Sequence, residues 1–178
     1  MEVVIAPAER LAVLAADAVD ALVRRVPDAV LGLATGSSPL RVYDELARRH
    51  VQEGLSFAGV RAFMLDEYVG LPAEHPQRYR NVIEAEIASR VDFAEGAVAG
   101  PDGNAGDLVA ACAAYEESIA GAGGVDLQIL GIGTDGHIAF NEPGSSLASR
   151  TRIKTLTAQT REDNARFFDG DVEQVPRH

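Results

Sequence analysis

The sequence predicts an α/β fold with a mainly parallel β-sheet. Two observations predict it: short apolar segments alternate with longer segments that carry apolar residues at helical spacing, and residues 29–34 are apolar throughout. Strand–helix alternation gives right-handed βαβ units, and a fully apolar strand is typical of a parallel sheet covered on both faces. At 178 residues, the chain is expected to form one domain, residues 1–178, with a sizeable core.

The elements follow in order from the N-terminus. A short strand is predicted over residues 3–6, and a helix over 7–25 begins at Pro7, a residue that suits the first helical turn. That helix carries apolar residues at helical spacing, namely Leu11, Leu14, Ala18 and Leu22. The next strands are predicted at 29–34, 60–65 and 125–130, with helices at 39–50, 79–89 and 107–122. Residues 96–106 are rich in Gly and Ala and are expected to be a connection.

The net charge of −11 argues against a nucleic-acid partner, which would require a basic face. No apolar run is long enough to span a membrane and the N-terminus lacks a signal-peptide pattern, so a cytoplasmic location is expected. The single cysteine, Cys112, cannot form an internal disulfide, and it lies in a predicted helix. We interpret it as a packing residue.

Basic residues gather near the end of the chain despite the acidic total. Residues 149–157 alternate as a strand does, which would place three of these cations on one face, and a last helix is predicted over 158–168. The cluster spans 17 positions and consists of Arg150, Arg152, Lys154, Arg161 and Arg166. It indicates either a site for a small anion such as a phosphate ester or a solvated charged surface.

Three polar loops follow predicted strands, at 35–39, 66–70 and 133–142. The carboxyl ends of parallel strands share one edge of the sheet, where open α/β folds bind their ligands. In the first loop, Thr35, Gly36, Ser37 and Ser38 precede a helix. They could hold a phosphate or simply cap that helix.

The other two loops carry groups for proton transfer. Asp66 ends a strand and is either a general base, with a pKa raised by burial, or an ordinary turn residue. Asp135, His137 and Glu142 could form a relay in which a carboxylate orients the imidazole. A metal site is the competing reading, but the remaining histidines and the cysteine lie outside these loops, which favours acid/base chemistry without a metal.

Three stretches together, at 63–72, 131–143 and 145–156, closely resemble glucosamine-6-phosphate deaminases. The resemblance covers essentially the whole chain. It implies a Rossmann-like three-layer fold with a mainly parallel sheet. It also implies conversion of glucosamine 6-phosphate and water to fructose 6-phosphate and ammonia, a step of amino sugar catabolism, without a cofactor.

The resemblance also implies roles for individual residues. Asp66 matches the base that takes the proton from carbon 2 of the substrate and returns one at carbon 1. His137 matches the residue that assists ring opening, with Asp135 and Glu142 as its partners.

Two binding sites are implied as well. The substrate phosphate site is matched by Thr35, Gly36, Ser37, Ser38 and Arg166. An allosteric site for N-acetylglucosamine 6-phosphate, found in members that are allosteric hexamers, is matched by Ser145, Arg152 and Lys154. A homo-oligomer is therefore expected for the full-length protein.

Family members continue well past the position of His178, by roughly a third of the chain. The resemblance thus implies a fold truncated on its C-terminal side, with an unpaired strand edge. We expect such a 178-residue chain to be unstable and weakly active at best.

Other functions stay open at this point. A 6-phosphogluconolactonase-like hydrolase has a similar loop, although that loop does not run into Phe-Asn-Glu-Pro. A sugar-phosphate-binding regulator would add a helix-turn-helix, for which the sequence leaves no room before its first predicted strand. A non-catalytic phosphosugar-binding fragment is compatible with all the residues above.

Overall fold

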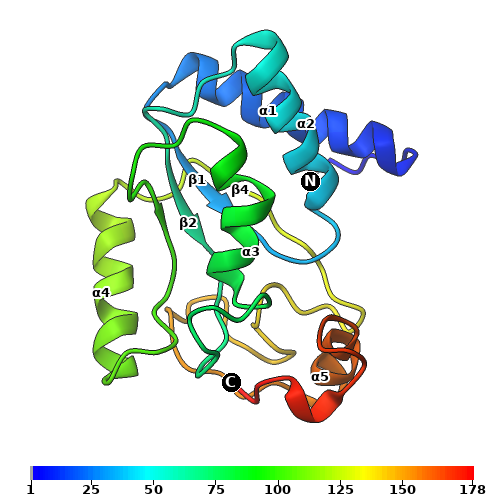
Figure 1. Ribbon diagram of the computed structural model, residues 1–178, viewed down its shortest axis with the longest axis vertical. Coiled ribbons are helices and arrows are strands. Elements are labelled where there is room, and N and C mark those ends of the chain that lie inside the picture. The colour runs from blue at the N-terminus through cyan, green and yellow to red at the C-terminus, as the bar shows by residue number, and fades with distance from the viewer. Residues whose placement is uncertain (1) are drawn as a thin grey trace.

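The sheet consists of four parallel strands in the order β3-β2-β1-β4. In the computed structural model, which describes residues 2–178, the strands are β1 (Val30–Leu33), β2 (Arg61–Met64), β3 (Val98–Ala99) and β4 (Leu127–Gln128). β1 lies between β2 and β4, with Leu31 opposite Ala62 and Leu127. The predicted parallel sheet is confirmed, and its strand ends point to one edge (Figure 1).

Helices form in every segment where the sequence predicts one. The α-helices are α1 (Ala8–Arg25), α2 (Leu40–Glu53), α3 (Tyr79–Glu86), α4 (Leu108–Gly121) and α5 (Ala158–Asn164). Short 3₁₀ turns follow at Ala88–Arg90, Ala165–Phe167 and Val172–Gln174.

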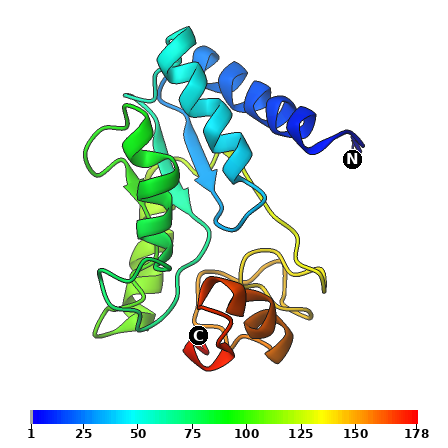
Figure 2. The same ribbon diagram turned by 45° about the vertical axis from the view of Figure 1, so that its right-hand side comes forward.

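The alternation of side chains along β1 creates the three layers. Leu31 and Leu33 face the larger core, which also contains apolar residues of α1, α2 and α3. Val30 faces the other way and packs with Phe63 of β2 and Tyr115 of α4. Helices therefore cover both faces of the sheet, as the continuous apolar strand predicts, and Figure 2 shows α1 and α2 together at one end of the molecule.

Two buried tyrosines fix the ends of the central strands. The Tyr43 hydroxyl of α2 donates to the carbonyl of Ala34 at 2.6 Å and accepts from its N–H at 3.0 Å. The Tyr115 hydroxyl donates to the carbonyl of Met64 at 2.7 Å. Both contacts satisfy polar groups where a strand opens into a loop, so the loops start from rigid points.

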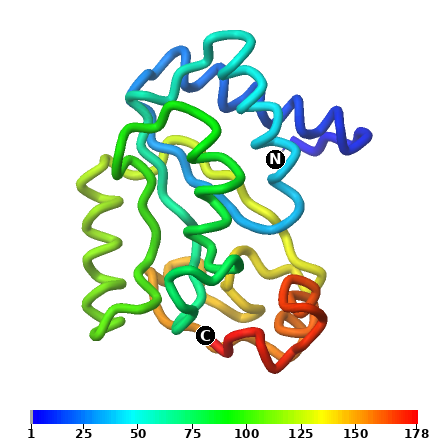
Figure 3. Tube along the Cα trace, in the orientation of Figure 1, coloured from blue at the N-terminus to red at the C-terminus, as the bar shows by residue number. Residues whose placement is uncertain are grey.

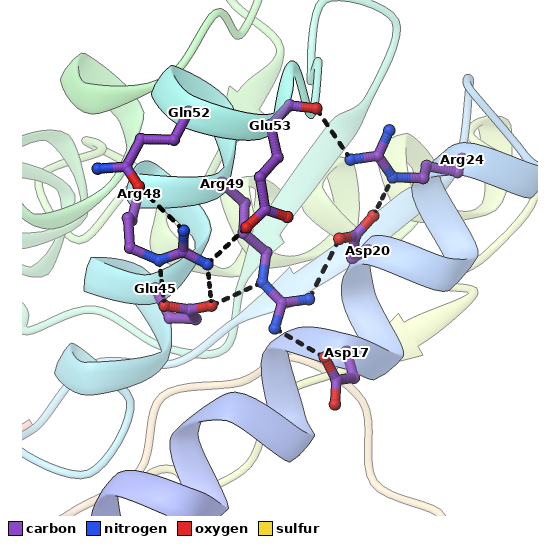
Figure 4. A network of polar contacts seen from close by, with 8 residues as sticks. All are labelled: Asp17, Asp20, Arg24, Glu45, Arg48, Arg49, Gln52 and Glu53. Carbon is purple, nitrogen blue, oxygen red and sulfur yellow. Dashed lines mark hydrogen bonds and ion pairs between the residues drawn. The ribbon is translucent and has the colours of Figure 1, made fainter.

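An ion-pair network joins α1 to α2 (Figure 4). At its centre, the Arg49 side chain is 8 % exposed and contacts Asp17 at 2.7 Å, Asp20 at 3.1 Å and Glu45 at 2.8 Å. Hydrogen bonds from Arg48 lower the pKa of Glu45 to about 2, so this carboxylate stays ionised at neutral pH. The network holds the two helices that cover one face of β1.

Two strand predictions are wrong. Residues 3–6 form no strand, and Val3 and Ile5 are 74 % and 95 % exposed, because no described strand lies beside them. Residues 149–157 form no strand either. Their backbone N–H groups bond elsewhere, that of Thr151 to Glu116 at 2.7 Å and that of Leu156 to the Arg177 carbonyl at 2.9 Å.

The sequence also missed one strand. β3 lies inside residues 96–106, which were expected to be a connection, and it pairs Val98 with Ala62 of β2. Two residues give no periodicity to detect, so the pairing depends on the tertiary position of β2.

Residues 131–178 form a lobe beyond the carboxyl edge of the sheet, coloured yellow to red in Figure 3. This lobe packs around a second core with the segment that follows β2, through Tyr68, Leu71, Leu156, Phe168 and Val175. Within residues 2–178, no helix is long and apolar enough to cross a membrane.

Candidate active site

The three predicted loops meet in a cavity of about 380 Å³ at the carboxyl edge of the sheet. Asp66 and His137 both line it, although 71 positions separate them in the sequence. The cavity is also lined by the candidate phosphate-binding residues Thr35, Gly36, Ser37, Ser38 and Arg166. The structure therefore brings a carboxylate, an imidazole and the candidate anion-binding loop to one cavity.

Asp66 lies just past the end of β2, partly buried in the cavity wall. Removal from water raises its pKa to about 7, with a second contribution from the charge of neighbouring Glu67. The backbone N–H of Phe140 acts in the opposite direction. A carboxylate that titrates near neutral pH is well matched to general base chemistry.

His137 is held by Asp135 within a tight turn. The turn is closed by the Gly133 N–H, which donates to the His137 carbonyl at 2.8 Å, and Gly136 adopts a φ of 88°. Asp135 Oδ1 lies 2.6 Å from His137 Nδ1 and accepts from the His137 N–H at 3.1 Å. These contacts, the backbone N–H first, lower the pKa of Asp135. An ionised Asp135 places the ring proton on Nδ1 and leaves Nε2 free to act on a ligand.

Glu142 lies close to His137, although no hydrogen bond joins the two side chains. Its side chain is buried and accepts from the Thr157 N–H at 2.9 Å, at the residue that caps α5. Donor atoms of Asp135, His137 and Glu142 lie within 4.8 Å of one another, a spacing that a metal ion could bridge. Asp135 and Glu142 already accept hydrogen bonds from the protein, so the arrangement is satisfied as it stands.

The loop before α2 offers open donors to an anion. α2 begins after Pro39, which makes no side-chain cap, and Gly36 has a φ of 95°. Within the described chain, neither Ser37 nor Ser38 caps the helix through its hydroxyl. Arg166 reaches the same cavity from the turn after α5, with its guanidinium 4.7 Å above the Phe167 ring. Positive charge beside free helix N–H groups suits a phosphate.

The three residues matched to an allosteric site do not share one place. Arg152 and Lys154 line a second cavity of about 280 Å³, on the side of the sheet that α4 covers. Arg152 donates to the Asn141 side chain at 3.1 Å. The Ser145 hydroxyl is buried and makes no hydrogen bond to the described residues, and it does not line this cavity.

Several residues at the cavity were not singled out from the sequence. Tyr79 and Asn164 line it, and Asn164 donates to the Tyr68 hydroxyl at 2.9 Å. The rings of Tyr68, Tyr79 and Phe140 pack with centroids 4.8 to 5.5 Å apart. The available signal was the Asp-Glu-Tyr segment itself: Tyr68 is buried directly behind Asp66 and contacts Tyr79, Phe140 and Asn164, which line the cavity.

A family model described as glucosamine-6-phosphate isomerases/6-phosphogluconolactonase matches residues 5–166. The chain belongs to this family. Two relatives within it are the glucosamine-6-phosphate deaminases of Beutenbergia cavernae and Mycolicibacterium smegmatis, which are 73 % and 72 % identical. Each alignment covers 100 % of this chain and 69 % of the relative.

Solved structures of proteins in this family superpose on the chain. A monomeric glucosamine-6-phosphate deaminase superposes with a TM-score of 0.96 at 42 % identity, over 99 % of this chain and 73 % of the other. A 6-phosphogluconolactonase from Thermotoga maritima superposes with a TM-score of 0.64 at 26 % identity, over 78 % of this chain and 64 % of the other. The Rossmann-like α/β fold of the family is therefore present here.

Proposed function

We propose that this protein converts glucosamine 6-phosphate and water to fructose 6-phosphate and ammonia, without a cofactor. The observation that carries the proposal is the cavity that joins Asp66, with a pKa of about 7, to the Asp135–His137 pair and to an anion-binding loop. Relatives 73 % and 72 % identical to the chain bear the name of this activity.

In the proposed reaction, Nε2 of His137 assists the transfer of a proton from the carbon 1 hydroxyl to the ring oxygen, and the sugar ring opens. Asp66 then takes the proton from carbon 2 while the carbon 1 oxygen gains one, which gives an enolamine. Asp66 returns a proton to carbon 1 and the amine loses one, which leaves a hydroxyl on carbon 1 and an imine at carbon 2. Water adds to carbon 2 of that imine, and ammonia leaves. A rigidly held carboxylate with a pKa near 7 is suited to remove a proton from carbon, while an oriented imidazole is suited to transfer a proton at the sugar oxygen.

The phosphate of the substrate is assigned to the loop before α2 and to Arg166. Thr35, Gly36, Ser37 and Ser38 would supply hydroxyl and backbone donors, and Arg166 the positive charge. With its phosphate bound at this end of the cavity, the substrate would extend carbons 1 and 2 toward Asp66. The phosphate, which does not react, would in this way help to orient the reacting carbons.

Regulation and assembly are proposed separately. Arg152 and Lys154 would bind the phosphate of N-acetylglucosamine 6-phosphate, supported by their shared cavity. Ser145, the third residue matched to this site, lies outside that cavity. Homo-oligomerisation and a cytoplasmic location stay predictions from the sequence.

The test is a coupled assay that measures ammonia and fructose 6-phosphate from glucosamine 6-phosphate, with 6-phosphogluconolactone as the competing substrate. Equal amounts of both products, lost in Asp66→Asn, support the deaminase. Hydrolysis of the lactone without ammonia release would support the hydrolase instead. Binding of glucosamine 6-phosphate by calorimetry without turnover would identify a phosphosugar-binding protein and reject the proposed reaction.

A further inference from the structure

Glu67 follows Asp66 directly and is built into the fold in an unusual way. Its side chain is only 1 % exposed. The carboxylate accepts three backbone hydrogen bonds, each of 2.9 Å, from the N–H groups of Tyr68, Tyr79 and Arg80. Tyr79 and Arg80 are the first two residues of α3, whose own N-cap residue makes no side-chain cap. Glu67 therefore caps α3 from the end of β2.

These contacts fix the position of the Glu67 carboxylate. The N-terminus of a helix is a favourable place for negative charge. A cation also lies near it, since Arg78 Nε is 3.9 Å from Glu67. A buried charge satisfied in this way is fixed in position, in contrast to a flexible carboxylate at the surface.

We propose that Glu67 is the positioning residue for Asp66: it ties the end of β2 to the start of α3 and keeps a fixed negative charge beside the base. The tie determines where Asp66 and Tyr79 face the cavity, because one residue precedes Glu67 and the other begins the helix that it caps. The inference rests on the proposed function only in calling Asp66 a base.

The fixed charge bears on the ionisation of Asp66. A second negative charge next to Asp66 is unfavourable, so Glu67 keeps the base protonated to a higher pH than burial alone would. The pKa of the Tyr68 hydroxyl is raised to about 12, chiefly by burial, and burial also raises the pKa of Tyr79 and Tyr115. All three are neutral near pH 7.

Asp66 lines both cavities, and other charged or titratable groups line one or the other of them. They are His137, Arg150, Arg152, Lys154, Arg166, Glu116, Asp102, Glu86, His178 and Cys112. The four cations favour the ionised base, and the three other carboxylates oppose it. Glu67 is directly adjacent to Asp66, and it is the charge of Glu67 that raises the pKa of Asp66 beyond the effect of burial.

The experiment measures the titration of Asp66 by carbon-13 NMR of its carboxyl group in the substrate-free protein. In the native protein the midpoint is expected near pH 7. In Glu67→Gln it should fall by about one pH unit or more, the size expected from a removed like charge. Glu67→Asp keeps the charge and is the matched control, with a midpoint close to the native value.

An unchanged midpoint in a folded Glu67→Gln variant would overturn the inference, since a purely structural cap does not act on the ionisation of Asp66. If Glu67→Gln does not fold, Arg78→Gln takes its place. It leaves all three hydrogen bonds to Glu67 intact and removes the nearby cation, so the midpoint should rise. No rise would contradict the proposal.

The deaminase assay separates this inference from the proposed function. With activity present, the acid limb of the kcat/KM profile should move with the Asp66 midpoint in Glu67→Gln. A shifted midpoint in a protein without activity supports the inference and rejects the proposed function. Deaminase activity together with an unchanged Asp66 midpoint in Glu67→Gln would support the proposed function and reject the inference about Glu67.

Discussion

The ring of His137 packs directly against the backbone of Gly133. A Cβ atom on Gly133 would come within 2.5 Å of both ring nitrogens of His137, a distance at which the ring must move. A glycine at position 133 therefore leaves the space that the His137 imidazole occupies. The first glycine of the same loop, Gly131, has nothing within 4 Å of its Cβ position.

Gly133→Ala is therefore expected to displace the His137 ring and to lower kcat on the order of 10- to 100-fold, the cost of misplacing a catalytic group. The His137 ring signals in NMR and the steady-state rate measure the effect. Gly131→Ala is the matched control and should lower the rate less. Equal losses in the two variants would show that the loop, rather than the ring contact, is responsible.

The raised pKa of Asp66 predicts opposite effects of pH on activity and stability. Activity should rise with pH through about 7 as the base ionises. The free energy of unfolding should fall between the ordinary Asp pKa and about 7, because the folded state binds the extra proton over that range.

Asp66→Asn tests both effects. It should lower kcat about 10³-fold and, at pH 8, raise the unfolding free energy by about 2 kcal/mol, allowing for partial exposure. Near pH 4 the variant and the native protein should be equally stable by urea titration. A variant that is less stable at pH 8 would contradict the pKa of about 7.

Asp135→Asn should lower kcat on the order of 10²- to 10³-fold, because the amide no longer holds the ring proton on Nδ1 of His137. Nitrogen-15 NMR of His137 should show a changed tautomer ratio. Asp163→Asn is the control, since Asp163 is a partly exposed carboxylate that accepts from the hydroxyl of Thr134 of the same loop at 2.8 Å. A native tautomer in Asp135→Asn would remove the proposed role of Asp135.

Arg166→Gln should raise KM for glucosamine 6-phosphate about 10- to 100-fold, because a charge-assisted contact to phosphate is lost. The effect on kcat should be smaller. Arg25→Gln, at the exposed end of α1, removes the same charge far from the cavity and should leave KM unchanged. An unchanged KM in Arg166→Gln would place the phosphate elsewhere.

Arg49→Met tests the network between α1 and α2 shown in Figure 4. Removing the buried guanidinium leaves Asp17, Asp20 and Glu45 without their shared partner, and the unfolding free energy should fall by about 2 kcal/mol. Arg41→Met on the same helix breaks only the exposed pair with Glu9, so it should change stability by under about 0.5 kcal/mol.

The parallel sheet and its covering helices could be predicted because apolar spacing reports burial directly. The strand predicted at 125–130 is longer than the observed one, because only Leu127 and Gln128 pair with β1. Residues 149–157 alternate as a strand does, but no neighbouring strand satisfies their backbone. The alternation of polar and apolar residues predicts which side chains share a face of an extended segment. Whether that segment joins a sheet depends on whether another strand lies next to it.

At the site, the meeting of Asp66 and His137 follows from the shared edge of parallel strands. The contacts of buried carboxylates could not be predicted in the same way. Glu142 lies within 4.8 Å of His137, as its predicted partnership requires, but its hydrogen bonds go to Thr157. Glu67 caps a helix that begins 12 positions later. Both contacts depend on how loops fold in space, for which the sequence has no periodic signal.

The bond between Glu142 and Thr157 has a mechanical consequence. Glu142 ends the loop that carries His137, while Thr157 starts the helix that leads to Arg166. Because the bonded carboxylate is 3 % exposed, water does not readily replace it. Under the proposed function, phosphate binding at Arg166 would therefore be coupled through α5 to the loop that carries His137, so that binding at one end of the sugar would order the groups at the other.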